Sequence, residues 1–234
     1  MAKKIIKFKK KECLFLCNKI YENQLAINTF GNASIFDKEN GLIYIKPSGV
    51  SQEKLTPDSI STIDIKTDNL LSGLKPSVDY LIHKSIYENF SNYQSIIHTH
   101  STYATILAQL NISPKCIGTT HADYTISSIP VTNEIKLNLN RNNYDHELNL
   151  SIYNVLKKQH YNFPFILIKD HGVLIFGESV EQTLDRAIAV EFICKTYYFS
   201  LLYTKKNIKI EKKTKEKFMY HDDRKNSKKK FYGQ

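Results

Sequence analysis

QSIIHTHS, residues 94–101, joins an apolar, strand-like segment to two histidines spaced two residues apart. Successive side chains of a strand alternate between its faces, so His98 and His100 point the same way and can reach one metal ion. Taken alone, an HxH triplet is more often incidental than functional. The stretch therefore predicts a strand over residues 94–98 and a metal site that needs further ligands.

β-type and helical patterns surround this strand. Runs rich in β-branched or aromatic residues, separated by Gly, Pro, Asn and Asp, predict further strands at 33–36, 42–45, 60–65, 165–168 and 173–176. Helical spacing predicts helices over 9–28 and 102–110, and one that follows the loop near 133–143 and ends at about 160. Helix-start signals predict two more, from Pro76 to about 89 and from a capping-box-like Ser179-Val-Glu-Gln182 to about 203. The polar region 133–143 predicts a loop.

Several of the connections between strands are too short for parallel crossovers. We therefore expect an α/β protein with a central, mostly antiparallel sheet flanked by helices. No internal repeat and no second domain is evident, so residues 1–234 form one predicted domain. Its lysine-rich end, from about residue 204, is predicted to be a tail.

The composition is that of an ordinary globular protein, with 41% hydrophobic residues and a formal charge of +10. The surplus of positive charge is largely lysine, and much of it follows Thr204, so we expect no nucleic-acid partner. Steep salt dependence of DNA or RNA affinity would instead support such a partner. The four cysteines form no CxxC pair, and we assign them no function. No apolar run approaches the length of a bilayer, and we expect a cytoplasmic protein without a membrane partner.

Two more residues are candidates for the metal site. His171 lies between two apolar runs and precedes a glycine, a pattern that alone favours a histidine satisfied within the core. Asp79 falls on the first turn of the helix predicted from Pro76, where the helix dipole stabilises an acid. Three imidazoles and one carboxylate suit a divalent transition metal, with zinc as the first expectation, acting as a Lewis acid.

Four segments occur in an order that resembles the class II aldolase family: Gly31-Asn-Ala-Ser34, Lys46-Pro-Ser-Gly-Val50, His98-Thr-His-Ser101 and His171-Gly172. A finer resemblance, to the L-ribulose-5-phosphate 4-epimerase branch, rests on Gly118-Thr-Thr-His-Ala-Asp-Tyr124, Ile129-Pro130 and an ending with His221, Arg224 and Phe231-Tyr-Gly-Gln234. It covers nearly the whole chain. It implies a three-layer fold and a C4 homotetramer with active sites between neighbouring subunits.

The resemblance also implies roles for residues. It places Zn²⁺ or another divalent metal on Asp79, His98, His100 and His171. It assigns substrate and phosphate binding to Asn32, Lys46, Ser48, Gly49, Ser77, Thr119 and Asp145, and acid–base catalysis to Asp123 and Tyr232, supported by His221 and His121. Without the resemblance, residues 46–49 would be an ordinary turn, Asp123 a turn residue and Tyr232 part of a solvated tail.

The implied reaction interconverts the pentulose phosphates L-ribulose 5-phosphate and D-xylulose 5-phosphate by retro-aldol cleavage of the C3–C4 bond and re-addition. The family's fuculose-phosphate aldolases carry glutamate at the position of Asp79, so aspartate favours the epimerase. Val78 replaces a second serine of the epimerases, and Asp145 replaces a glutamate, which leaves affinity and substrate identity open. The alternatives are an aldolase or another lyase of the family and a non-catalytic, adducin-like binding module.

Overall fold

The computed structural model describes residues 2–134, 144–158, 163–204 and 212–226. Its centre is a seven-stranded sheet in which every described ladder is antiparallel. The spatial order is β4 (Leu70–Ser72), β3 (Ser61–Asp64), β2 (Leu42–Ile45), β1 (Asn32–Asp37), β5 (Ser95–Thr99), β7 (Gly172–Gly177) and β6 (Phe165–Ile168). The predicted antiparallel sheet is confirmed, whereas the short strand β4 was missed.

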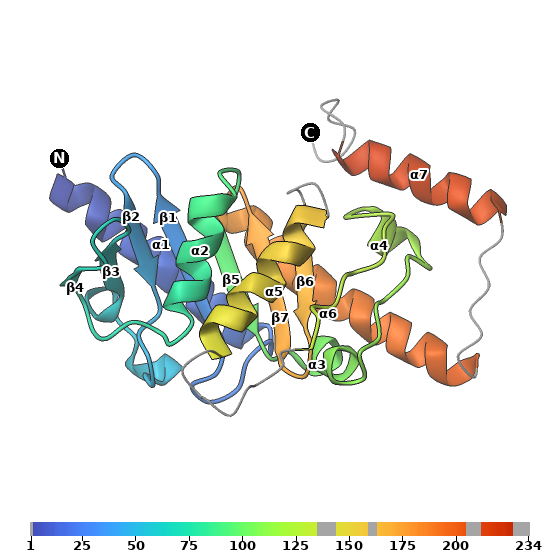
Figure 1. Cartoon of the computed structure of the whole chain (residues 1–234), viewed down its shortest axis with the longest axis horizontal. Coiled ribbons are helices and arrows are strands. Elements are labelled where there is room, and N and C mark those ends of the chain that lie inside the picture. The colour runs from blue at the N-terminus through green and yellow to red at the C-terminus, as the bar shows by residue number, and fades with distance from the viewer. Residues whose placement is uncertain (1, 135–143, 159–162, 205–211, 227–234) are drawn as a thin grey trace.

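Helices cover both faces of this sheet and give three layers (Figure 1). One face carries α1 (Ala2–Glu22), α3 (Thr102–Gln109) and α6 (Val180–Tyr203), and the other carries α2 (Tyr80–Asn89) and α5 (Tyr144–Lys158). The short helix α4 (Thr119–Ala122) and α7 (Lys212–Asn226) contact each other at one end of the molecule. Two 3-10 turns, Gln52–Lys54 and Pro57–Ser59, precede β3. The predicted three-layer class is confirmed.

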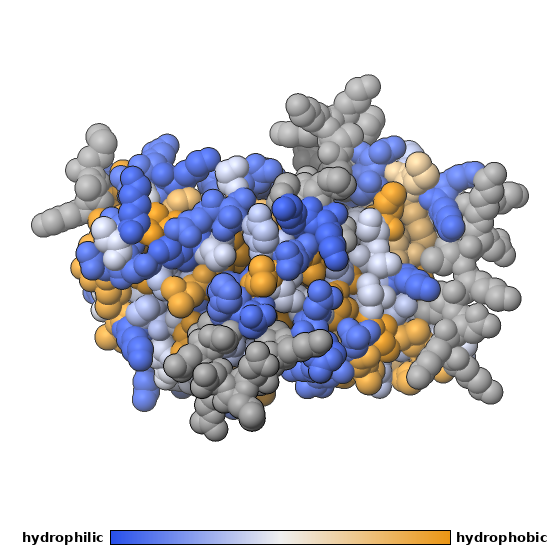
Figure 2. Space-filling model, viewed as in Figure 1, coloured by the Kyte–Doolittle hydropathy of each residue, from blue (hydrophilic) through white to orange (hydrophobic). Residues whose placement is uncertain are grey.

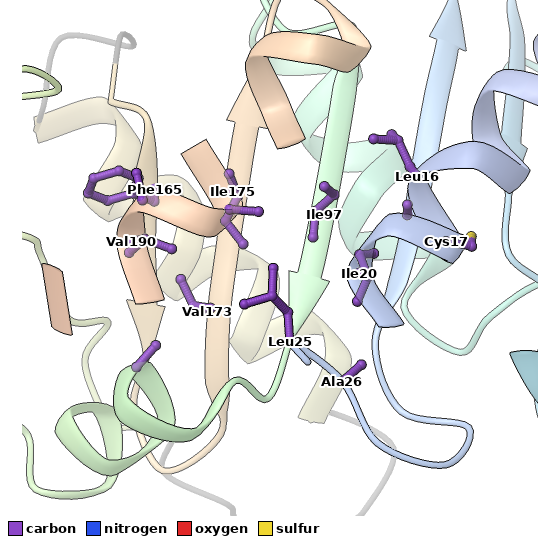
Figure 3. Packing of buried hydrophobic residues seen from close by; sticks show 14 of the residues in the cluster. Leu16, Cys17, Ile20, Leu25, Ala26, Ile97, Phe165, Val173, Ile175 and Val190 are labelled. Atoms are coloured by element: carbon purple, nitrogen blue, oxygen red, sulfur yellow. The ribbon is translucent and has the colours of Figure 1, made fainter. Parts of the chain in front are cut away.

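The sheet separates two hydrophobic clusters because strand side chains alternate between faces. Ile97 of β5 belongs to the cluster under α1, α3 and α6, and its neighbour Ile96 belongs to the cluster under α2 and α5. Figure 3 shows part of the first cluster, where Leu16 and Ile20 of α1 lie beside the sheet. All four cysteines are buried and free, as small apolar residues of the interior.

Two predicted helix starts are wrong. The helix predicted from Pro76 begins at Tyr80, because Pro76 forms an extended bridge with Pro47 instead of a first helical turn. The first helix begins seven residues before the predicted 9 and ends at Glu22 rather than 28, just before Gln24 adopts a φ of 57°. Lysine is a good helix former, so the basic start of the chain extends α1.

The predicted capping box at the start of α6 is half correct. The Ser179 hydroxyl accepts a hydrogen bond from the Gln182 N–H at 3.2 Å. The Gln182 side chain, however, accepts from the Glu178 N–H at 2.8 Å, one residue before the position that a capping box uses. The helix ends at Tyr203, as predicted.

The predicted tail contains a docked helix. Phe218 of α7 is only 5% exposed and packs with Cys116 and Ala122 beside α4. One buried aromatic side chain therefore fixes α7, and with it His221, against the body of the chain. The lysines of this segment hid a helix in which, among the described side chains, only Phe218 is a buried apolar residue.

Part of the surface is apolar at the edge of the sheet. Figure 2 shows hydrophobic residues at the left of the view, where β4 lies in Figure 1. Leu70, Leu71 and the following Leu74 are 45%, 56% and 49% exposed. An edge strand with apolar side chains offers unpaired backbone groups to another chain.

None of the described helices combines the length and the apolar character needed to cross a bilayer.

Helix α3 follows the HxH segment directly, and a side chain of α6 holds its start. Both carboxylate oxygens of Glu191 accept backbone hydrogen bonds, from Tyr103 N–H at 2.9 Å and from Ala104 N–H at 3.0 Å. These are two of the amides that a helix start leaves without an intrahelical partner. Glu191 thus links α6 to the segment that carries His100.

We expect Glu191→Gln to lower the free energy of unfolding by about 1–3 kcal/mol, because the amide can satisfy only one of the two half-buried N–H groups. Urea denaturation of the two proteins measures the difference. Glu39→Gln, in the exposed turn between β1 and β2, is the matched control and should change stability by less than about 0.5 kcal/mol. Equal effects of the two variants would show that Glu191 does not hold α3.

Candidate functional site

His98 lies near the end of β5, directly opposite Asn32 of β1 and Leu174 of β7. It is 3% exposed, and its Nδ1 lies 3.1 Å from the Val173 carbonyl oxygen. Because a carbonyl can only accept, Nδ1 carries the ring proton and donates it, which leaves the Nε2 lone pair free. Histidines that bind metals are oriented in this way.

His100 and His171 bring their rings against His98. The ring centroids are 4.9 Å apart for His98 and His100, 5.0 Å for His98 and His171, and 4.7 Å for His100 and His171. Ligand atoms of all three lie within 4.8 Å of one another. Among the described residues, this is the one such cluster of His, Cys, Asp or Glu. The structure therefore brings together the three predicted imidazole ligands.

The three rings fit a divalent metal by distance and by protonation. The Nε2 atoms of His98 and His100 are 3.1 Å apart. In a tetrahedral site with metal–nitrogen distances of about 2.0–2.1 Å, ligand nitrogens lie roughly 3.3 Å apart. Burial lowers the pKa of His98 to about 3 and also lowers the pKa of His100 and His171. At neutral pH all three rings are then neutral, as metal ligands must be.

The turn between β6 and β7 places His171. Asp170 has a φ of 60°, in the left-handed region, and reverses the chain just before His171. Gly172 then passes so close to β5 that a Cβ there would lie 2.4 Å from the Thr99 carbonyl oxygen and 3.1 Å from the His100 ring. A side chain at position 172 cannot fit, so the glycine allows the third histidine to approach the other two.

Asp79 lies next to the histidines without joining their cluster. It precedes α2 as its N-cap, and its Oδ2 accepts a hydrogen bond from Asn32 Nδ2 at 2.6 Å. Asn32 thereby uses an amide hydrogen, and its Oδ1 is buried with no partner among the described residues. Asp79 and the triad line the same pocket, but the predicted role of Asp79 as a metal ligand stays a prediction.

Five of the residues predicted to bind substrate or phosphate line the same pocket: Asn32, Lys46, Ser48, Gly49 and Ser77. Two loops are joined by backbone hydrogen bonds, from Ser48 N–H to the Lys75 carbonyl at 2.9 Å and from Ser77 N–H to the Lys46 carbonyl at 3.0 Å. These amides are therefore not available to a ligand, whereas the Ser48 and Ser77 hydroxyls line the pocket. Gly49 has a φ of 67°, and a Cβ at this position would meet no atom within 4 Å, so its backbone faces open space.

Lys46 is the positively charged group that lines this pocket. It is 3% exposed, and its Nζ donates to the Thr29 carbonyl oxygen at 3.0 Å. Among the described residues it forms no salt bridge, and burial lowers its pKa. A buried ammonium group without a carboxylate is costly, and an anion in the pocket would offset that cost.

The pocket as a whole has a volume of about 340 Å³. Besides the predicted residues, it is lined by Phe30, whose ring stacks on His100 with a centroid distance of 5.7 Å and an interplanar angle of 7°. Sequence reasoning missed Phe30 because a single aromatic residue before a glycine carries no pattern. Val78, at the rim, is 76% exposed.

Two further predicted residues meet elsewhere in the chain. His221 Nδ1 of α7 lies 2.9 Å from Asp123 Oδ1, at the end of α4, and both side chains are about a fifth exposed. Figure 1 shows α4 and α7 at the upper right, far from the β6–β7 turn at the lower end of the sheet. Thr119 lines a separate hollow beside α6. Within one chain, these residues do not reach the histidine triad.

The remaining predicted residues give less information. Tyr232 lies outside the described residues, as does the side chain of Asp145 in α5. The His121 Nε2 donates to the Ser127 carbonyl oxygen at 3.1 Å, so this ring stabilises the loop after α4. Its predicted role in supporting Asp123 stays a prediction.

Comparisons with known proteins agree with this geometry. An "L-ribulose-5-phosphate 4-epimerase UlaF" of Salmonella paratyphi C is 32% identical over 168 residues, which are 71% of this chain and 74% of the relative. A "Probable L-ribulose-5-phosphate 4-epimerase UlaF" of Mycoplasma pneumoniae is 31% identical over 215 residues, 90% of this chain and 88% of the relative.

Solved structures share the fold. An L-fuculose 1-phosphate aldolase superposes with a TM-score of 0.74 at 23% identity, covering 91% of this chain and 94% of that one. The l-fuculose-1-phosphate aldolase of Thermus thermophilus gives 0.65 at 17% identity, covering 86% and 97%. Residues 11–198 match the family described as "Class II Aldolase and Adducin N-terminal domain". With its histidine triad, its buried lysine and its antiparallel three-layer fold, the chain belongs to the class II aldolase and adducin family.

Proposed function

We propose that this protein is an L-ribulose-5-phosphate 4-epimerase, which interconverts L-ribulose 5-phosphate and D-xylulose 5-phosphate. The observation that supports this function most directly is a single pocket that combines three neutral imidazoles with a buried lysine that forms no described salt bridge. Such a pocket suits a divalent metal on one side and a phosphate group on the other. The names of two relatives that align with most of the chain support this choice of substrate.

The proposed metal is Zn²⁺, held by His98, His100 and His171, with Asp79 beside them. Three imidazole nitrogens are a common zinc donor set that leaves a position open. When bound, the ion supplies Lewis-acid polarisation of the ketose carbonyl and the adjacent hydroxyl. Phe30 stacks on one side of the His100 ring and so limits how far this ring can turn.

The chain's own residues bind the substrate and move its protons. Lys46 and the hydroxyls of Ser48 and Ser77 hold the phosphate, which fixes the C4 end of the sugar. Removal of the C4 hydroxyl proton turns that group into an aldehyde carbonyl as the C3–C4 bond breaks, and the electron pair of the bond passes to C3 and is delocalised onto the C2 carbonyl as an enolate. After the aldehyde has rotated, C3 of the enolate adds to its other face, which re-forms the bond, inverts C4 and returns a proton to the C4 oxygen. Because the two epimers present this proton on opposite faces, two acid–base groups are needed, for which we propose Asp123 and Tyr232.

We further propose that the acid–base groups come from a neighbouring subunit. The Asp123–His221 pair and Thr119 lie away from the triad of their own chain, so a second chain must bring them to it. A cyclic tetramer repeats one such contact four times. His221 orients the Asp123 carboxylate, and Asp145 and Thr119 would contact the substrate across the same interface.

Incubation of the purified protein with L-ribulose 5-phosphate tests the function. We expect D-xylulose 5-phosphate as the product, loss of conversion after chelation, recovery when Zn²⁺ is restored, and no stoichiometric metal in His98→Asn. Free glycolaldehyde phosphate or lactaldehyde in bulk solution would instead indicate an aldolase. A wild-type protein that holds no metal and converts its substrate in excess chelator would rule out the proposed site.

Lys46→Met should weaken binding of the phosphorylated substrate by about 10- to 100-fold, because a hydrogen bond to a charged group contributes roughly 1.5–3 kcal/mol. Calorimetry of the metal-loaded protein with substrate measures this loss. Lys38→Met, in the exposed turn after β1, removes the same charge elsewhere and should leave the affinity unchanged. If both variants bind as the wild type does, Lys46 does not contact phosphate.

A further inference from the structure

The three imidazoles of the triad differ in what holds their rings. His98 Nδ1 donates to the Val173 carbonyl oxygen at 3.1 Å, and His171 Nδ1 lies 3.5 Å from the Tyr144 hydroxyl. His100, in contrast, forms no hydrogen bond through its Nδ1 to any described residue. A metal-binding histidine is normally oriented by a bond at the nitrogen that faces away from the metal. The orientation of His100 therefore needs another explanation.

The ring of His100 must be held because its Nε2 has to meet the other ligand atoms. This nitrogen lies 3.1 Å from the Nε2 of His98, so Nε2 faces the metal position and Nδ1 faces away from it. The χ2 torsion of a histidine is broad, and a ring without a hydrogen bond at Nδ1 can swing about its Cβ–Cγ bond. Such a swing moves Nε2 out of the triad and lowers metal affinity.

The aromatic ring of Phe30 covers one face of His100. The two ring centroids are 5.7 Å apart and the ring planes differ by only 7°. Near-parallel rings at this separation form an offset stack, which is a favoured arrangement of aromatic pairs. Phe30 is 50% exposed and belongs to none of the described hydrophobic clusters. Its stack on His100 is thus the described ring contact of a residue that the core does not need.

The backbone around Phe30 is fixed from two sides. The Phe30 N–H donates to the Ile27 carbonyl oxygen at 3.0 Å, which closes a turn just before β1. The carbonyl oxygen of the preceding residue, Thr29, accepts a hydrogen bond from Lys46 Nζ at 3.0 Å. Because the backbone is held at both points, the exposed ring is presented at a defined place against His100.

We infer that Phe30 is a positioning residue of the metal centre: its stacked ring holds the plane of His100 and takes the place of the polar contact that His98 and His171 have at Nδ1. The inference rests on the proposed metal site. It gives a role to a residue that neither binds the metal nor belongs to the phosphate-binding set.

Zinc affinity, measured by competition with a chelator, tests this role. Phe30→Leu keeps an apolar side chain but removes the flat ring, and it should weaken zinc binding by about 2- to 10-fold, the size of an aromatic pair's contribution. Phe30→Tyr keeps the ring, and the exposed position leaves room for the added hydroxyl. It should therefore bind zinc as the wild type does.

Phe15→Leu is the matched control. Phe15 lies on α1 and is 43% exposed, so this variant loses a similar aromatic side chain without touching the pocket. Its zinc affinity should equal that of the wild type, and urea denaturation of the metal-free proteins should show similar stability for both leucine variants. A loss of zinc affinity that Phe30→Tyr shares in full, together with a loss of metal-free stability, would mean that Phe30 acts only on folding and would overturn the inference.

The visible absorption of Co²⁺ in place of Zn²⁺ reports the arrangement of the ligands directly. We expect an altered spectrum for Co²⁺-loaded Phe30→Leu, because the His100 ring is no longer held in one plane. Phe30→Tyr and Phe15→Leu should keep the wild-type spectrum. If the spectrum and the zinc affinity of Phe30→Leu are both indistinguishable from those of Phe15→Leu, the inference is overturned.

Neither experiment uses a sugar phosphate. If the protein binds zinc with the expected dependence on Phe30 but does not epimerise L-ribulose 5-phosphate, the positioning role stands and only the proposed substrate is wrong. If it epimerises the sugar while Phe30→Leu behaves as the control does, the proposed function stands and the role of Phe30 is rejected. A wild type that binds no zinc would reject the metal site and this role together.

Discussion

We expect Asp123→Asn to lower turnover by about 10²- to 10⁴-fold, the usual contribution of a positioned acid or base, while zinc binding stays unchanged. Asp123 and His221 are hydrogen-bonded at 2.9 Å but lie away from the triad of their own chain. The loss of activity should therefore be repairable by another subunit. Steady-state assays and metal analysis of the single variant give the first half of the test.

The second half mixes subunits carrying Asp123→Asn with subunits carrying His98→Asn. Each variant alone should be nearly inactive. After unfolding and reassembly in equal amounts, roughly a quarter of neighbouring pairs combine an intact triad with an intact Asp123, so activity should return to about that fraction of wild type. Native mass spectrometry verifies that mixed assemblies form. Proven mixed assemblies without any regained activity would refute a site shared between subunits.

The other large effect is expected at Gly172. Gly172→Ala places a methyl group 2.4 Å from the Thr99 carbonyl oxygen, so β7 must move away from β5 or the turn that carries His171 must shift. We expect a loss of about 1–3 kcal/mol in unfolding free energy, as for other overpacked interiors. Zinc affinity should fall by about 10- to 100-fold or more, because one ligand is displaced.

Gly118→Ala is the matched control for this substitution. Gly118 has an extended backbone, and a Cβ there meets no atom within 4 Å. It lies at the start of α4, away from the histidines, so both unfolding free energy and zinc affinity should stay close to wild type. If Gly172→Ala binds zinc as tightly as Gly118→Ala does, the close approach of β7 does not set the triad geometry.

The sequence predicted the fold class because the strand and helix patterns were strong and local. Residues 42–45 and 165–168 match β2 and β6 as predicted, and α6 ends at Tyr203 as predicted. The start of α2 was wrong because proline suits either a first helical turn or an extended bridge, and only the contact with Pro47 decides between them. Helix α7 was missed because one buried Phe218 among many lysines leaves no periodic pattern.

The candidate site was predictable where the residues are close in sequence, as in the HxH segment, or matched a family pattern, as for His171. The buried contact of His83 Nδ1 with Ser34 Oγ, at 2.6 Å, was not predicted, although Asp79, His83 and Tyr87 recur at helical spacing. Polar residues at that spacing normally mark a solvent-exposed face, and only the burial of α2 against β1 reverses this interpretation. That Asp123 lies away from the triad of its own chain was likewise beyond local patterns, since it depends on distances across the whole fold.

Helix α2 contacts β1 at three places, Asp79 with Asn32, His83 with Ser34 and Tyr87 with Phe36, and these contacts limit how the sequence can change in length. Four helical residues rise about 6 Å and two strand residues about 6.6 Å, so the two elements stay in step over three contacts. One residue inserted between Asp79 and Tyr87 would rotate the later part of α2 by about 100° and separate His83 from Ser34. We therefore expect the interval from Asp79 to Tyr87 not to tolerate an insertion, and a redesign of the pocket should substitute side chains there and keep the length of the interval.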